Sequence, residues 1–380
     1  MTTSWPRIAL LYVIGVLAAG QLGVLPALLA SLQRDLGLSL AMAGMAVSIV
    51  TMVGALIGLP AGGWSERMGH ARALAIGLLI MAVAALSCAV ANDAVVLLIA
   101  RAFAGVGYLL VVVAGPSLMA LSAQQRHQPL ALSLWGTFVP VGIALAGLAT
   151  SHFTDWRAIF ALDGVLLILA LIVALAALRK VPSSQVQRRH AISFAALKPS
   201  LPLALGFFCF ALLFLALAGL LPTYLIDRRG VEPANSGRIA ALATAAGIVG
   251  SLAAGGLMRR GFSPAMLATV GLLASTALAA LALSVEMPLW LVVTGFTAAF
   301  AIGGLVPAAV FASVPMVAAD TRAIGPINGL LAQAGSLGSL AGPPLLALWV
   351  DATSWATAPI LLLAIAALGA ASASSRRPRR

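Results

Sequence analysis

Two charged residues lie inside long apolar stretches of the sequence. Arg101 interrupts the run at 95–119, and Asp163 interrupts the run at 157–178. A charge in apolar surroundings is costly unless it is paired or hydrated, so each residue needs a function or a partner. If both runs start at the same membrane face, 101 − 95 and 163 − 157 each give 6 residues, about 9 Å of depth. Arg101 could attract an anion or take part in proton coupling. It could instead be a structural arginine held by backbone carbonyls or by Asp163, its candidate charge partner.

Three uncharged polar residues near the middle of apolar runs are further candidates: Gln21, Tyr108 and Gln333. A glutamine in hydrocarbon needs hydrogen-bond partners, so each glutamine should face either a cavity or a neighbouring helix. Tyr108 follows Arg101 by seven residues, which places both on one helix face. We expect Gln21, Arg101, Tyr108 and Gln333 to bind a substrate. The runs hold no nucleophile, base and acid set, so we predict no catalytic residue and no enzyme.

The composition requires a membrane to surround these residues. The chain is 62% hydrophobic and 8% charged, with a mean hydropathy of +1.09. A soluble domain could not bury so much apolar surface. Long runs that do not alternate favour helices over a β-barrel. Both cysteines lie inside apolar runs and no metal-ligand spacing occurs, so we expect neither a metal nor a cofactor.

The runs predict an all-α integral membrane protein with twelve spans. Each is close to the roughly 20 residues that cross a bilayer. The predicted limits are 8–32, 41–61, 73–91, 95–119, 131–150, 157–178, 202–226, 238–258, 265–285, 289–318, 327–349 and 356–373. The tenth span is overlong, and Pro307 and Pro315 could bend it or end it early.

The net charge of +12 is unevenly distributed. With the N-terminus inside, sixteen of the 22 Lys and Arg residues fall in inner loops and ends, and five fall outside. The positive-inside rule therefore places both termini in the cytoplasm. This distribution explains the positive charge without a nucleic-acid partner.

The chain also contains an internal repeat. Residues 179–200 form a polar, basic linker between two six-helix halves, 1–178 and 201–380. At an offset of 193, Gly37 pairs with Gly230, Gly62 with Gly255, Arg67 with Arg260, and Gly142 with Gly335. Single glycine matches are weak, but the shared register extends over more than 100 residues. Two halves of the same orientation indicate a duplicated transporter.

A charged turn at 62–72, GGWSERMGHAR, lies between the second and third spans. It resembles the loop that major facilitator superfamily (MFS) transporters have at this place. The matching residues are Gly62, Glu66, Arg67, Gly69 and Arg72. The resemblance implies a conformational gate that latches the cytoplasmic side, two six-helix halves and a central cavity. The sequence from Arg101 to Gly107 is similar to the fourth-helix pattern of the family, although Ala104 replaces a residue that is often polar.

Two further stretches bear on the branch of the family. Residues 105–117, GVGYLLVVVAGPS, resemble a branch described as cyanate/nitrate-permease-like. Residues 136–142, GTFVPVG, partly resemble the signature of drug/proton antiporters, but Val139 stands where a glycine usually precedes the proline.

These observations predict a secondary active transporter that moves a small solute by alternating access, with protons as a candidate driving ion. A small organic or inorganic anion would suit Arg101. The alternative is an efflux antiporter for lipophilic compounds, and a channel or a polytopic membrane enzyme is a more distant alternative. We expect a monomer in a bacterial cytoplasmic (inner) membrane, with a small-molecule substrate and lipid as its partners.

Overall fold

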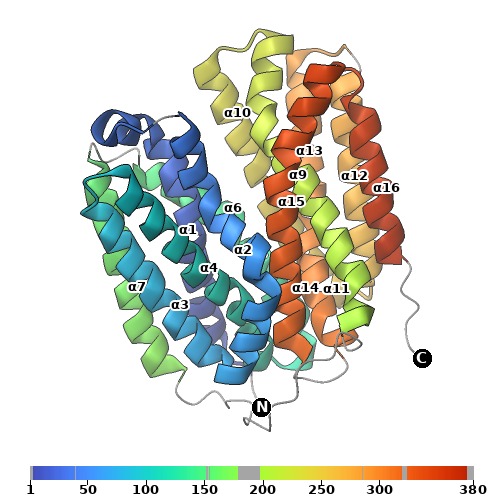
Figure 1. Cartoon of the computed structure of the whole chain (residues 1–380). Coiled ribbons are helices and arrows are strands. Elements are labelled where there is room, and N and C mark those ends of the chain that lie inside the picture. The colour runs from blue at the N-terminus through green and yellow to red at the C-terminus, as the bar shows by residue number, and fades with distance from the viewer. Residues whose placement is uncertain are drawn as a thin grey trace. The chain divides into compact units, whose positions relative to one another are not determined.

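The computed structural model describes residues 3–38, 40–150, 153, 155–178, 197–284, 286–318 and 323–374. The described residues are mainly helical and contain no strand, which confirms the predicted all-α class (Figure 1). The helices up to the linker are α1 (Trp5–Leu36), α2 (Leu40–Met68), α3 (His70–Ala89), α4 (Ala94–Ser122), η1 (Gln125–His127), α5 (Gln128–Trp135), α6 (Phe138–Thr150) and α7 (Trp156–Ala177). Those after it are η2 (Lys198–Ser200), α9 (Leu201–Arg229), α10 (Pro233–Ala245), α11 (Gly247–Arg259), α12 (Pro264–Ser284), α13 (Leu289–Gly303), α14 (Leu305–Val317), α15 (Ile324–Ala352) and α16 (Ala358–Ser374).

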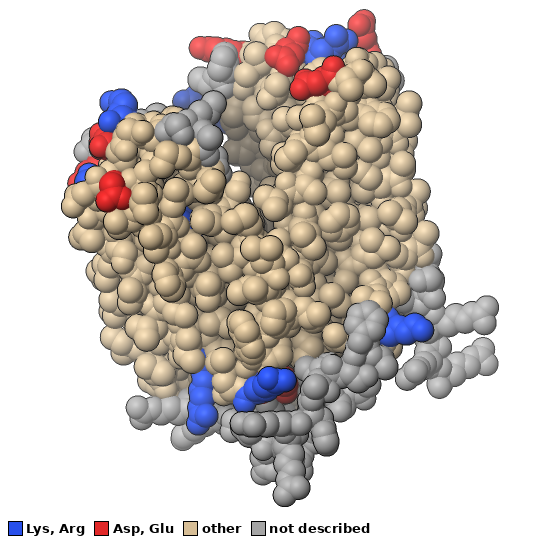
Figure 2. Space-filling view, viewed as in Figure 1, with Lys and Arg blue, Asp and Glu red and all other residues tan. Residues whose placement is uncertain are grey.

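Ten segments of the described chain are long and apolar enough to cross a membrane. The apolar part of α16 is shorter, and α15 is not among the ten. The count of twelve spans and the cytoplasmic termini therefore stay predictions. On the face shown in Figure 2, charged side chains gather at the ends of the helices. The described surface between them is almost uncharged, as expected for a surface in contact with lipid.

Prolines explain two breaks within the predicted spans. The fifth span divides into α5 and α6 at Gly136, and the tenth into α13 and α14 at Gly304. Proline has no N–H for the carbonyl four residues earlier. For Pro140 that carbonyl belongs to Gly136, and for Pro307 it belongs to Gly303. The tenth span therefore breaks just before Pro307, whereas Pro315 lies inside α14.

The chain packs as two compact units. Unit 1 comprises Met1–Ala131, Phe138–Leu197 and Ala318–Gln333, and unit 2 comprises Leu132–Thr137, Lys198–Val317 and Ala334–Arg380. The predicted division at 178 and 201 stays a prediction, and residues 179–196 of the predicted linker lie outside the described residues.

The two units repeat one pattern of helix pairs. In unit 1, α3 packs against α4 and α7, α2 against α4, and α1 against α6. In unit 2, α12 packs against α13, α14 and α16, and α11 against α13 and α14. Gly338 and Gly342 of α15 pack against the backbone of α9, as Gly142 of α6 packs against α1. These pairs match span by span, which agrees with the sequence repeat.

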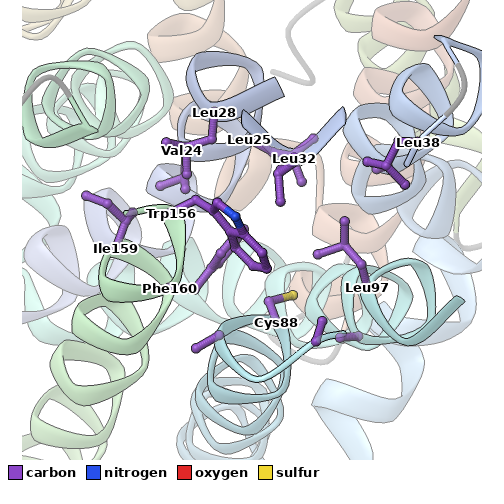
Figure 3. Packing of buried hydrophobic residues seen from close by; sticks show 14 of the residues in the cluster. Val24, Leu25, Leu28, Leu32, Leu38, Cys88, Leu97, Trp156, Ile159 and Phe160 are labelled. Carbon is purple, nitrogen blue, oxygen red and sulfur yellow. The ribbon is translucent and has the colours of Figure 1, made fainter. Parts of the chain in front are cut away.

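A hydrophobic cluster joins the ends of α1, α3 and α7 in unit 1 (Figure 3). Trp156 lies at its centre, among leucines of α1 and Cys88 of α3. The Trp156 ring N–H donates to the carboxylate of Asp35 over 2.8 Å, and the guanidinium of Arg157 lies 4.1 Å above the ring. Arg157 also donates to the carbonyl of Ala91. These contacts fix α7 beside α1, and Asp163 lies two turns further along the same face of α7.

Candidate functional site

Arg101 lies at the centre of a polar cluster inside unit 1. Its side chain is fully buried. Its Nη1 donates to the side-chain oxygen of Gln21 over 2.9 Å, and its Nη2 to the backbone oxygen of Gln21 over 2.8 Å. Its Nε donates to the carbonyl of Ala46 over 3.4 Å. These hydrogen bonds use three of the five N–H groups of the guanidinium, so Arg101 ties α4 to α1 and α2.

Asp163 joins this cluster through Gln21. The Nε2 of Gln21 donates to the carboxylate of Asp163, so one amide connects the acid with the guanidinium. Asp163 is half-buried, whereas Gln21 is 1% exposed. Arg101 and Asp163 each lie seven residues beyond the first residue of their helices, since 101 − 94 and 163 − 156 both equal 7. Arg101 and Asp163 are thus connected by hydrogen bonds through Gln21, and we call this hydrogen-bonded chain the relay. The predicted charge pairing of Arg101 and Asp163 stays a prediction.

Glycines bring the helices close enough for this relay. A Cβ on Gly105 would lie 3.0 Å from the backbone of Val50 on α2. Gly105 and Val50 each lie one turn beyond Arg101 and Ala46, which are themselves in contact. A Cβ on Gly107 would lie 2.5 Å from the carbonyl oxygen of Gly77 on α3. The glycines of the Arg101 motif therefore set the packing of α4 on two neighbours.

The other two candidate binding residues lie apart from the cluster. Tyr108 is half-buried and packs against Val50, Ala84 and Ala104. Gln333, on α15, has its side-chain amide hydrogen-bonded to the backbone of α2. A role of either residue in substrate binding stays a prediction, and in this structure the amide of Gln333 is occupied by α2.

The predicted gate residues lie at the end of α2, next to the start of α15. Gly69 has φ +88°, a left-handed conformation that favours glycine, and it forms the turn into α3. A Cβ on Gly62 would lie 2.6 Å from the carbonyl oxygen of Gly325. Arg67 and Arg72 are exposed. Two of the five predicted gate residues therefore have to be glycine. Gly69 has a positive φ, and Gly62 has no space for a side chain.

Glu66 faces the first turn of α15. Its Oε2 lies 2.8 Å from the position that a Cβ of Gly325 would take. The same oxygen lies 3.1 Å from Nε2 of His70, and Nδ1 of His70 shares a hydrogen bond with the hydroxyl of Ser65 over 2.9 Å. A carboxylate near the start of a helix is favoured by the helix dipole. The arrangement can hold the start of α15 against α2.

Two adjacent glycines allow a matched test of this contact. We predict that Gly62→Ala destabilises the protein by about 1–3 kcal/mol, because the new methyl group would overlap α15. A Cβ on Gly63 has no neighbouring atom within 4 Å, so Gly63→Ala should be neutral or stabilising by up to about 1 kcal/mol. Thermal unfolding of both variants in the same detergent measures the difference. Equal melting temperatures would argue against a close contact in solution.

Four residues at the gate are not among those predicted from the sequence. They are Gly325 and Gly329 on α15, His70 beside Glu66, and Gly58, one turn before Gly62 on α2. The spacing of four residues between Gly58 and Gly62, and between Gly325 and Gly329, is the small-residue pattern of closely packed membrane helices. That spacing is the signal that could have indicated the contact.

Comparisons with known proteins agree with this architecture. The family model described as Major Facilitator Superfamily matches residues 11–343. No curated relative matches the sequence. A crystal structure of the MFS transporter FucP in the outward conformation is similar with a TM-score of 0.80 and 16% identity, covering 98% of each chain.

Two other solved structures have the same fold. The human organic anion transporter MFSD10 aligns with a TM-score of 0.76 and 15% identity, over 96% of this chain and 98% of that one. The proton:xylose symporter XylE aligns with a TM-score of 0.76 and 14% identity, over 96% and 94%. At these identities the structures establish the fold, and the family model covers most of the sequence. The chain therefore belongs to the Major Facilitator Superfamily.

Proposed function

We propose that this protein is a proton-coupled secondary active transporter that moves a small solute by alternating access. A small organic or inorganic anion is the favoured cargo. The observation that carries the proposal is the hydrogen-bonded relay from the buried Arg101 through Gln21 to the half-buried Asp163. It combines a fixed positive charge with a carboxyl group that can take up and release a proton.

The charges of the relay suggest how an anion and a proton could move together. With Asp163 ionised, the positive charge of Arg101 and the negative charge of the acid cancel. An anion that binds near Arg101 adds one negative charge in a poorly solvated region, and a proton on Asp163 restores neutrality. Each ligand therefore favours the binding of the other, because coupling between two sites is reciprocal. The expected result is symport, with both species moving in one direction.

Hydrogen-bond chemistry supports an anion site at Arg101. The acceptors that it has in the structure are neutral amide and carbonyl oxygens. An anionic acceptor adds coulombic attraction to the positive guanidinium, and this attraction is strong in a poorly solvated region, so a small anion could replace one of these acceptors. The half-buried Asp163 is the more accessible end of the relay.

Proton coupling is also described for two solved structures with this fold. FucP is described as a fucose:proton symporter from E. coli, and XylE as a proton:xylose symporter. MFSD10 is described as an organic anion transporter. We extend coupling to this chain as a proposal. The proposal includes a single chain in a bacterial cytoplasmic membrane, with both termini in the cytoplasm.

An aromatic surface in unit 2 favours the alternative cargo, a lipophilic compound. Phe207, Phe210 and Phe214 share one face of α9 and are half-buried, with ring centroids 6.0 and 5.6 Å apart. Phe311 and Phe300 pack edge-on against this row. Such a surface suits apolar or aromatic molecules. In this alternative the protein is an efflux antiporter and Arg101 is structural.

Ligand-dependent thermal stabilisation of the purified protein distinguishes these functions. A ligand that binds the folded state raises the melting temperature with its concentration. The test ligands are the anions nitrate, cyanate and lactate, the neutral sugars fucose and xylose, and the lipophilic cation tetraphenylphosphonium. We expect one of the anions to raise the melting temperature more than the sugars or the cation do. Stabilisation by tetraphenylphosphonium alone would support the efflux antiporter. Stabilisation by a sugar alone would contradict the proposal that the cargo is a small anion.

A further inference from the structure

The side-chain amide of Gln333 lies between two backbone groups of α2. Its Oε1 accepts a hydrogen bond from the N–H of Leu59 over 3.2 Å, and its Nε2 donates to the carbonyl of Ala55 over 2.9 Å. Ala55 and Leu59 are four residues apart, so a regular α-helix would join this carbonyl and this N–H directly. The side chain of Gln333 thus binds the donor and the acceptor that would form one backbone hydrogen bond in a regular α2.

The amide lies at a kink of α2. Ile57, between the two bound residues, has φ −124° and ψ 18°, which is outside the helical range. Pro60 follows in the same helix and has no N–H for the carbonyl of Leu56. Kinks in helices arise at proline and where a polar group inserts into the hydrogen-bond ladder, and both causes are present here.

Glycines allow Gln333 to reach this position. A Cβ on Gly58 would lie 2.6 Å from Cβ of Gln333, and a Cβ on Gly329 would lie 2.6 Å from the carbonyl oxygen of Gly58. On α15, Gly325, Gly329 and Gln333 follow at intervals of four residues and face Gly58 and Gly62 on α2. The start of α15 is therefore fitted to the kinked form of α2 over two helical turns.

We propose that the side-chain amide of Gln333 inserts reversibly into the backbone hydrogen bonds of α2. It holds α2 kinked while the start of α15 lies against α2. When residues 323–333 leave α2, Leu59 can donate directly to Ala55, and α2 straightens. The N–H of Leu59 and the carbonyl of Ala55 thus have a partner in both forms, so the switch leaves neither of these two groups unpaired in the membrane. This switch rests on the proposed alternating access, because departure of α15 would open the gate at Gly62 and Glu66.

Spin labels on α2 test the switch. Met52 and Trp64 are partly exposed and lie on either side of the kink. Labels are attached to M52C and W64C after Cys88 and Cys209 are replaced by alanine, and pulsed electron paramagnetic resonance measures their separation. Gln333→Met keeps the length of the side chain but removes both hydrogen bonds. We expect it to raise the ratio of straight to kinked α2 about tenfold, since it removes the bonds that favour the kink.

Two further variants make the result specific. Gln333→Glu keeps an acceptor for Leu59 but places a second oxygen against the carbonyl of Ala55, so we expect an intermediate shift. Ser117→Ala removes the hydrogen bond that Ser117 accepts from Asn328 of α15 but leaves both hydrogen bonds of Gln333 in place, so we expect a smaller shift than in Gln333→Met. An unchanged separation in Gln333→Met, or an equal shift in Ser117→Ala, would overturn the proposal. The measurement needs no cargo, so its failure is distinguishable from a failure of the proposed transport.

Discussion

Replacing Arg101 by methionine is expected to destabilise the protein by about 3–5 kcal/mol and to abolish anion binding. The change removes the hydrogen-bond donor to three buried oxygens. They are the side-chain oxygen of Gln21, the backbone oxygen of Gln21 and the backbone oxygen of Ala46. The change also leaves the carboxylate of Asp163 without its compensating charge. A buried acceptor that loses its donor costs about 1–3 kcal/mol, so three such acceptors account for a loss of this size. Thermal unfolding measures the stability, and ligand-dependent stabilisation measures the binding.

A double variant separates the two effects. Arg101→Met combined with Asp163→Leu removes both charges, so no unpaired charge stays buried. We expect the double variant to be more stable than the sum of the two single changes predicts, and still not to bind an anion. Additive losses would show that Arg101 and Asp163 are not coupled through Gln21. Anion binding that survives in the double variant would make the relay purely structural.

Asp163→Asn is expected to separate cargo movement from proton movement. An asparagine keeps the side-chain size and can still accept a hydrogen bond from Gln21, but it cannot bind or release a proton. We predict that exchange of cargo across the membrane continues, while accumulation driven by a pH gradient is lost and the accumulation ratio falls to about one. Uptake of radiolabelled cargo into proteoliposomes measures both.

The carboxylate at the start of the same helix provides the control. Asp155 caps α7 by accepting a hydrogen bond from the backbone N–H of Arg157 over 2.9 Å. Asp155→Asn changes a carboxylate of α7 outside the relay, so coupling should be retained. Loss of accumulation in both variants would show that any change of charge on α7 disturbs transport, and the assignment to Asp163 would fail.

The sequence was sufficient to find the members of the relay, because polar residues are rare in apolar runs. Gln21, Arg101 and Asp163 are recognisable on that ground alone. The hydrogen bonds that connect them cannot be predicted from the sequence, because Gln21 lies 80 residues from Arg101 and 142 residues from Asp163. Depth counted along the helices places Arg101 and Asp163 at one level, but it cannot show that a third side chain lies between them.

At the gate, too, the sequence indicates some of the residues but not the residues that face them. The turn at 62–72 indicates which residues of α2 take part, because the motif is local. The groups that face them belong to α15, more than 250 residues later. The sequence predicts that Gln333 faces either a cavity or a neighbouring helix, because a lone glutamine in an apolar run needs a partner, but it does not show that α2 supplies this partner. Likewise, Pro307 indicates a break in the tenth span, but its position follows from the carbonyl four residues earlier.

Proton movement that accompanies the cargo tests the proposed coupling at Asp163. Proteoliposomes with a trapped pH-sensitive dye, held at zero membrane potential, receive the anion that stabilises the purified protein. We predict that the interior becomes more acidic as the anion enters through the wild-type protein. With Asp163→Asn, the anion should enter without acidification. Entry through the wild type without a pH change, or equal acidification by both proteins, would contradict the proposed coupling at Asp163.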